Sequence, residues 1–188
     1  VDTRIEFFWG GNIERITITG ILPNQLSAAS FIFNTNTAAL APDNSNSSDL
    51  LFGGLGNDSL DGSGGNDQIT GGTGTDNLIG WTGNDTLSGG AAHDIFPYTA
   101  RGFGLDTITD FSTGDRIDLS LLGIGDYATL QPFIAQVGVD TRIEFFWGGN
   151  IERITITGVL PNQLSAASFI FNTNTAALAP DNSNASDL

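Results

Sequence analysis

Residues 53–97 read GGLGNDSLD GSGGNDQIT GGTGTDNLI GWTGNDTLS GGAAHDIFP when they are cut into five blocks of nine. Every block has aspartate at its sixth place and an apolar residue at its eighth place. The aspartates are Asp58, Asp67, Asp76, Asp85 and Asp94, and the apolar residues are Leu60, Ile69, Leu78, Leu87 and Phe96. A fixed register of this kind indicates a repeat array. A disordered acidic linker, the alternative interpretation of a Gly/Asp-rich tract, has no reason to keep that register.

The residue types within a block predict how it folds. Glycine recurs at places one, two and four, and glycine adopts positive φ without steric cost, so six residues can form a tight turn. The other three residues, with one inward-facing apolar side chain, suit a very short strand. Two turns and two strands close a coil every two blocks, and successive coils stack at about 4.8 Å, the spacing of paired strands. The sequence therefore predicts an all-β parallel β-roll in which each aspartate lies over the aspartate two blocks earlier.

The charge of this stretch requires a cation from outside the chain. Between Arg15 and Arg101 the sequence has no Lys or Arg, so stacked carboxylates have no internal counter-charge. Carboxylate and carbonyl oxygens, in a chain with one His and no Cys, favour Ca²⁺ over zinc or a softer metal. The whole chain has 21 acidic and 6 basic residues and a net charge of −15. This balance argues against nucleic acid or anionic lipid as a partner.

The blocks resemble the RTX (hemolysin-type) nonapeptide G-G-x-G-x-D-x-U-x, and the resemblance implies a calcium-bound parallel β-roll. It further implies that each ion lies between two turns, with carbonyls from places two and four of the earlier turn and places one and three of the later turn. Both turns also give their aspartate. The implied sites are Gly54, Gly56 and Asp58 with Gly71, Thr73 and Asp76; Ser63, Gly65 and Asp67 with Gly80, Thr82 and Asp85; and Gly72, Gly74 and Asp76 with Gly89, Ala91 and Asp94. An imperfect block from Asn44 adds Asp49, which forms a fourth, incomplete site with Asp67 because Ser45 and Ser47 replace glycines, and we expect about 3–5 ions.

A longer repeat sets the predicted domain organisation. Residues 1–50 recur as 139–188 with two differences, Ile21 against Val159 and Ser47 against Ala185, which indicates tandem duplication. Because the chain has no Met, we expect it to be part of a longer array. The predicted parts are a β-hairpin tail of a preceding unit (1–33), a linker (34–48), the roll (49–100), an antiparallel β cap with short helical turns (101–171) and a second linker (172–188).

The expected cap has its own resemblance. Residues 106–111 and 116–121 are predicted as short strands, residues 126–137 as a short amphipathic helix, and residues 139–171 as a hairpin, a helical turn and a closing strand. The run DTITDF…GDRIDLSLLG with LSAASFIF is similar to the C-terminal domain of serralysin-type secreted metalloproteases. That resemblance implies that Asp106 and Asp110 complete a terminal calcium site.

No catalytic site is predicted. Zinc proteolysis requires two His residues on one helix, and a Ser-His-Asp site requires one, whereas His93 is the single His and is expected as an exposed turn side chain. Asp140 and Glu144 lie on a predicted strand with Arg142, which favours cross-strand ion pairing over acid–base catalysis.

Tryptophan residues raise one further alternative. Trp81 occupies place two of its block, where glycine is usual, and we expect it to pack on the cap or the N-terminal copy rather than dock a partner. Trp9 and Trp147 are expected in the cap core.

The sequence leaves three functions open. The first is a calcium-folded structural module of a secreted or surface-exposed repeat protein, adhesin-like or matrix-like, whose partners are neighbouring units or end-to-end copies. The second is the non-catalytic calcium-folding domain of an exoenzyme of the serralysin type. The third is ice binding on Thr73, Thr75, Thr82 and Asn84. The family implies folding after export by type I secretion, and no run of residues is apolar enough to span a membrane.

Overall fold

The computed structural model describes residues 2–9, 12–19 and 48–172. Contacts divide the chain into two units, Val1–Phe33 and Asn34–Leu188. In the first unit, β1 (Asp2–Trp9) pairs antiparallel with β2 (Asn12–Thr19), so the predicted hairpin is present. The helical turn and closing strand expected before residue 34, and both linkers except Ser48 and Asn172, lie outside the described residues.

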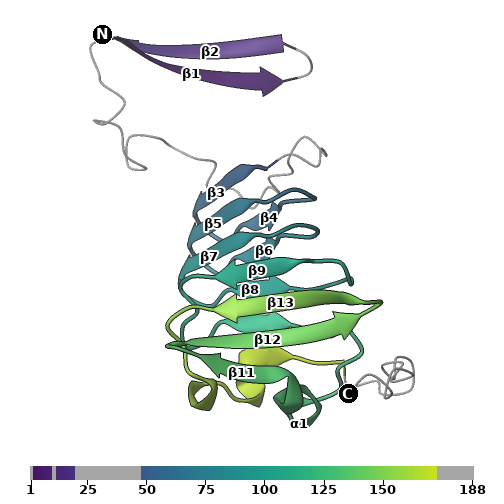
Figure 1. Cartoon of the computed structure of the whole chain (residues 1–188). Coiled ribbons are helices and arrows are strands. Elements are labelled where there is room, and N and C mark those ends of the chain that lie inside the picture. Colours follow the sequence, from purple (N-terminus) through teal and green to yellow (C-terminus); the bar gives the residue numbers. More distant parts are fainter. Residues whose placement is uncertain (1, 10–11, 20–47, 173–188) are drawn as a thin grey trace. The chain divides into compact units, whose positions relative to one another are not determined.

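The second unit begins with a roll of two parallel sheets (Figure 1). One sheet contains β3 (Leu50–Leu55), β5 (Gln68–Thr73), β7 (Thr86–Ala91) and β9 (Leu105–Ile108). The other contains β4 (Ser59–Asp61), β6 (Asn77–Ile79), β8 (Ile95–Pro97), β10 (Arg116–Asp118) and β14 (Phe169–Ile170). Leu60 pairs with Leu78, and Ile69 with Leu87, so each strand lies beside the strand two blocks away, as predicted.

The apolar residue at place eight of each block forms the core of the roll. Leu60, Ile69, Leu78, Leu87 and Phe96 are all at most 1% exposed. Their burial supplies the hydrophobic stabilisation of each coil, about 1.5–3 kcal/mol for a side chain of this size. The aspartate two positions earlier also points inward, but it does so from the turn.

Parallel pairing continues beyond residue 100, where the sequence places the boundary between roll and cap. Thr107 of β9 pairs with Thr86, and Arg116 of β10 pairs with Ile95. The interval between stacked aspartates is 18 residues earlier in the roll and 21 from Asp85 to Asp106, so three residues are inserted here. After this insertion the nine-residue spacing resumes with Asp106 and Asp115, and with the buried Ile108 and Ile117.

The remaining elements cover the end of the roll. They are α1 (Tyr127–Leu130), the 3₁₀ turn η3 (Gln131–Phe133), β11 (Ile134–Val137), β12 (Asp140–Trp147), β13 (Asn150–Ile156), η4 (Pro161–Gln163) and η5 (Ala166–Ser168). β13 pairs parallel with β9, and β12 pairs antiparallel with β13 and β11. The stack of strands in Figure 1 therefore continues from the roll into the hairpin.

The predicted helix over 126–137 is wrong beyond Phe133. Helical structure ends at η3, and Ile134–Val137 forms a strand opposite Ile143–Asp140. Pro132 removes one backbone donor, which prevents the helix from continuing, and the β-branched Ile134 and Val137 favour the strand. None of the described helices is both long enough and apolar enough to cross a membrane.

Candidate metal sites

The turns of the roll place eight aspartates in two columns. The first column is Asp49, Asp67, Asp85 and Asp106, and the second is Asp58, Asp76, Asp94 and Asp115. In each column the backbone N–H of one aspartate donates to the Oδ1 of the next, over 2.8–2.9 Å. One carboxylate oxygen of each later aspartate therefore fixes the turn before it.

The second carboxylate oxygen is buried without a hydrogen-bond partner. Asp58, Asp67, Asp76, Asp85 and Asp94 are each at most 5% exposed, and the Oδ2 of each has no partner among the described residues. Burying an ionised carboxylate in this way is costly unless an opposite charge compensates it. Within the described residues the ion pair of Arg153 with Glu144 lies outside the columns. A cation between the turns would supply the opposite charge.

The pKa values of the column aspartates also show that burial disfavours their ionised form. Burial raises the pKa of Asp85 and of Asp94 to about 6, and the neighbouring carboxylates of each column add to the rise. Burial raises the pKa of Asp106 to about 8, with the charges of Asp85 and Glu152 contributing, while the Asp85 amide acts in the opposite direction. The charged forms that a metal ion would bind are therefore disfavoured when no ion is bound.

Backbone carbonyl groups point from each turn toward the next turn of the same column. A side chain on Gly72 would collide with the carbonyl oxygen of Gly54, and one on Gly74 with that of Gly56. Both glycines also have positive φ, 114° and 125°, which other residues rarely adopt. These positions require glycine because carbonyl oxygens of the preceding coil approach them closely.

Carboxylate and carbonyl oxygens also converge from two coils. A carbon added to the Cα of Gly53 would lie 2.5 Å from both the Oδ2 of Asp58 and the carbonyl oxygen of Gly71. The same two kinds of oxygen meet at Gly62, from Asp67 and Gly80, and at Gly71, from Asp76 and Gly89. Calcium binds 6–8 oxygens at 2.3–2.6 Å and accepts carbonyl and carboxylate groups together. The oxygens of the turns fit this ion.

Side chains alone do not form a metal site. In the ranges that the structure describes, no three His, Cys, Asp or Glu side chains form a group that could hold an ion. The donor set therefore depends on backbone carbonyls, and this dependence agrees with the glycine pattern. Sulfur and imidazole ligands are missing from the turns, apart from His93, which is exposed as predicted.

Each predicted pair of turns is stacked. In the first predicted site the amide of Gly56 donates to Thr73 over 2.8 Å, and in the second the amide of Gly65 donates to Thr82 over 2.9 Å. In the third, Gly74 donates to Ala91 over 3.1 Å. A carbonyl oxygen has two lone pairs, so these acceptors keep one for a metal ion. For the fourth site, Asp49 stacks on Asp67, while Ser45 and Ser47 lie outside the described residues.

The last coil differs from what the serralysin resemblance implies. Asp106 continues the first column, but Asp110 is not in a column. The carboxylate of Asp110 instead accepts hydrogen bonds from the amides of Gly89 and Gly90 at 3.0 and 2.9 Å and from the Ser88 hydroxyl at 2.7 Å. Asp115 occupies the column position and was missed by sequence reasoning. Its nine-residue distance from Asp106, with Ile108 and Ile117 in register, was the signal for it.

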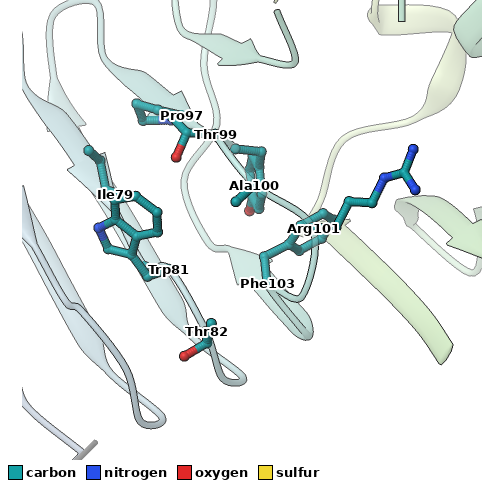
Figure 2. A pocket seen from close by; sticks show the side chains of 10 residues that line it. Ile79, Trp81, Thr82, Pro97, Thr99, Ala100, Arg101 and Phe103 are labelled. Atoms are coloured by element: carbon teal, nitrogen blue, oxygen red, sulfur yellow. The ribbon is translucent and has the colours of Figure 1, made fainter. Parts of the chain in front are cut away.

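Trp81 lies beside the three inserted residues. It has a positive φ of 65° and is 39% exposed, and it lines a shallow notch with Pro97, Ala100, Arg101 and Phe103 (Figure 2). Trp147 packs against the buried core, as predicted, with its ring stacked 4.7 Å from that of Phe145. The side chain of Trp9 lies outside the described residues.

The cross-strand ion pair that the sequence suggested is present, with a different partner. The Nε of Arg153 donates to the Oε1 of Glu144 over 2.6 Å, across the β12–β13 pair. Asp140 instead accepts a hydrogen bond from the amide of Gly158 at 2.8 Å. This arrangement stabilises the hairpin and brings no acid–base pair together.

Comparison with known proteins places these features in a family. The profile described as "RTX calcium-binding nonapeptide repeat (4 copies)" matches residues 43–78 and 70–96. A comparison with curated protein sequences gave no match.

Two similar solved structures are solution structures of subunits of a mannuronan C5-epimerase from Azotobacter vinelandii. The AlgE6R2 subunit has a TM-score of 0.56 and 27% identity, over 68% of this chain and 89% of that one. The AlgE6R3 subunit has a TM-score of 0.53 and 30% identity, over 72% and 86%. The matched part, 68–72% of this chain, is longer than the nonapeptide blocks.

Proposed function

The chain belongs to the RTX calcium-binding nonapeptide repeat family, and from this we propose that it is a structural module of a long secreted or surface-exposed protein, folded by calcium after export. RTX repeats typically occur in secreted bacterial proteins. The buried Oδ2 atoms of Asp58, Asp67, Asp76, Asp85 and Asp94 carry the proposal, because they have no hydrogen-bond partner among the described residues and a cation would compensate their charge.

The residues of the turns would act together on each ion. The carboxylates of Asp58 and Asp76, with the carbonyl groups of Gly54, Gly56, Gly71 and Thr73, would hold the first ion, and the other two predicted sites repeat this arrangement. Bound calcium supplies the positive charge that lets two buried carboxylates lie in adjacent coils. The amide-to-carboxylate bonds then fix the register of the coils, and the apolar stack of Leu60, Leu78 and Phe96 closes.

Export is the step at which this dependence is useful. Extracellular calcium-binding modules have dissociation constants of about 10⁻⁴–10⁻³ M. The concentration of free calcium inside a cell is far below these values, so such sites stay empty there. In low calcium the columns repel and the roll stays open, so the chain can cross a secretion channel unfolded. Where calcium is plentiful, binding free energy becomes folding free energy. We propose type I secretion as the route.

The repeated sequence supports a structural role within an array. Residues 1–50 and 139–188 differ at only two positions, so even the segments expected as loops are nearly identical. Nearly identical units suit a spacer that is built from repeated copies. The partners proposed are calcium ions and neighbouring copies of the unit. Light scattering in calcium distinguishes a monomer from end-to-end assembly.

Chelation tests the proposal. Circular dichroism should show a β signal in millimolar calcium and its loss in excess EDTA, with recovery when calcium, but not an equal amount of magnesium, is restored. Magnesium is the matched control because it prefers octahedral sites with several waters over a cage of carbonyl groups. A β signal that is the same in EDTA and in calcium would exclude calcium-dependent folding.

The two similar structures favour a second function. Both are subunits of an epimerase, so this chain could serve as an accessory module of a secreted enzyme. The sequence of the full-length protein discriminates between the two functions. The sequence repeats after 138 residues, since residue 1 recurs as residue 139. Further copies of this unit support the structural module, and a catalytic domain beside a single copy supports the accessory module.

A further inference from the structure

Glu152 of β13 is a buried carboxylate that the calcium sites described above do not use. It is 4% exposed, and its Oε1 accepts a hydrogen bond from the amide of Gly102 at 2.7 Å. Its Oε2 is buried and has no hydrogen-bond partner. Glu152 lies on the β12–β13 hairpin, whereas the Gly102 amide that donates to it lies in the last turn of the first aspartate column.

The surroundings of Glu152 are acidic. Gly102 lies in the turn 101–106, which ends at Asp106, and the amide of Asp85 donates to the Oδ1 of Asp106 over 2.9 Å. The buried Oδ2 of Asp85 has no hydrogen-bond partner among the described residues, and the buried Tyr98 hydroxyl lies close to Asp106, which is 1% exposed. The charge of Glu152 is felt at Asp106, because it helps to raise the pKa of that residue.

Among the side chains that the structure describes, no basic group compensates these carboxylates. Glu152 makes no ion pair with any described residue, and Arg153, its neighbour in the chain, pairs with Glu144 on the outer face. The Arg101 guanidinium lies 5.0 Å above the ring of Trp147. Docking the hairpin onto the roll therefore buries a further carboxylate beside those of Asp85 and Asp106, with no opposite charge from the described residues, and this is unfavourable for the ionised form.

We propose that the gap between turns 80–85 and 101–106 holds a calcium ion whose charge also compensates Glu152, so that docking of the β12–β13 hairpin is coupled to occupation of this site. This inference rests on the calcium binding proposed above. Because no three carboxylates among residues 48–172 form a metal-binding group, Asp85 and Asp106 bind the ion with turn carbonyls, and Glu152 is a positioning residue that acts through its charge. Coupling is reciprocal: if the docked carboxylate tightens calcium binding, calcium tightens docking by the same factor.

The coupling makes docking of the cap in each unit depend on calcium bound to the same unit. β13 is the strand through which the cap joins β9, so the cap closes on the roll only when the last gap is neutralised. Glu14 occupies the same position in the first hairpin, opposite Phe7 as Glu152 is opposite Phe145. In an array, every hairpin would carry this residue to its own roll.

Terbium provides a direct measurement, since it binds oxygen ligands as calcium does and its emission is sensitised by a nearby tryptophan. Trp81 lies in turn 80–85, which borders this gap and the gap to turn 62–67, so the emission lost in Trp81→Phe reports these two gaps. For Glu152→Gln, the terbium concentration that gives half of this emission should rise about tenfold. For Glu144→Gln, which changes the half-buried and ion-paired carboxylate of the same hairpin, this concentration should not change, and the same holds for Glu14→Gln.

Glu152→Asp separates charge from hydrogen bonding. It keeps the charge but shortens the reach to Gly102, whereas Glu152→Gln keeps an acceptor for Gly102 and loses the charge. The proposal predicts that the Asp variant stays closer to the unmodified chain than the Gln variant. The reverse order, or a Gln variant that titrates like the Glu144→Gln control, overturns it.

Two further outcomes have a fixed meaning. If Glu152→Gln lacks the β signal of the folded roll even in saturating calcium, the Asp variant decides: half-emission near that of the unmodified chain supports the proposal, and a tenfold rise overturns it. If the unmodified chain binds neither terbium nor calcium, the proposed function itself fails. Loss of the effect at Glu152 alone, with binding intact, removes only the coupling.

Discussion

The backbone amide of Asp58 donates a 2.8 Å hydrogen bond to the carboxylate of Asp76, eighteen residues later in the chain. That bond satisfies one oxygen of Asp76 and leaves its Oδ2 buried and unpartnered. Asp76 also donates its own amide to Asp94, so it has a neighbour in the column on both sides. The structure therefore contains stacked carboxylates that backbone amides hold in register, and a positive charge between them would compensate their burial.

Asp76→Asn should weaken calcium-dependent stability more than any end member of the column. Asp76 belongs to two predicted sites, so the change removes a ligand charge from both, and we expect a loss of about 3–5 kcal/mol. Calcium titrations followed by circular dichroism measure it. Asp118→Asn is the matched control, since Asp118 lies outside the columns and accepts a hydrogen bond from the nearby amide of Ser120. Equal midpoints for the two variants would contradict the shared role of Asp76.

Gly74→Ala should destabilise the roll by more than the strain of its backbone alone. Both Gly74 and Gly138 have positive φ. A residue with a side chain is destabilised by about 1–2 kcal/mol in this backbone conformation. At Gly138 nothing lies near an added Cβ, whereas at Gly74 the carbonyl oxygen of Gly56 occupies its place. Denaturant unfolding in calcium should show a clearly larger loss for Gly74→Ala than for Gly138→Ala. A similar loss at both positions would mean that the turns are not closely stacked.

Without calcium, the protein should become less stable as the pH rises from about 4 to 8. The pKa values of Asp85 and Asp94, about 6, and of Asp106, about 8, lie above the ordinary value of 3.8. A raised pKa stabilises the fold while the group is protonated, and this contribution is lost as the pH passes through the folded-state value. Circular dichroism in EDTA should therefore show more β structure at pH 5 than at pH 8.

Calcium binding should release protons in the same range, because the ion binds the deprotonated carboxylates. Calorimetry at pH 6 in two buffers of different ionisation enthalpy measures the number released. Release of no protons would show that the aspartates are already ionised in the calcium-free protein.

Asp115→Asn should raise the calcium concentration needed for folding, and Asp110→Asn should not. Asp115 accepts a hydrogen bond from the amide of Asp94 within the second column. The carboxylate of Asp110 accepts hydrogen bonds from the amides of Gly89 and Gly90, and the side-chain oxygen of Asn can keep part of this bonding. Both variants are compared by their calcium midpoints. A larger shift for Asp110→Asn would favour the ligand set that the serralysin resemblance implies.

The strict nine-residue register was sufficient to predict the roll, its parallel pairing and the stacking of the aspartates. It succeeded because glycine positions and the apolar place eight constrain the backbone locally. The prediction failed at Tyr98–Ala100, where three inserted residues interrupt the period and hide Asp115. It also failed at Glu152, because a strand residue with no repeat pattern reaches its neighbours only through tertiary pairing of β13 with β9.

The cap was harder to predict for a similar reason. Residues 134–137 carry no clear period, and their strand forms because the edge of β12 is available to pair with them. Sequence periodicity cannot indicate which edge a short strand will join, since that depends on the completed sheet.

A crystal structure of the protein grown in calcium, with anomalous scattering recorded for the metal, tests the central claim most directly. The account predicts calcium between successive turns of both columns, with aspartate and carbonyl oxygens at about 2.3–2.6 Å. Gaps between Asp58 and Asp76 and between Asp67 and Asp85 that contain no anomalous density would contradict it.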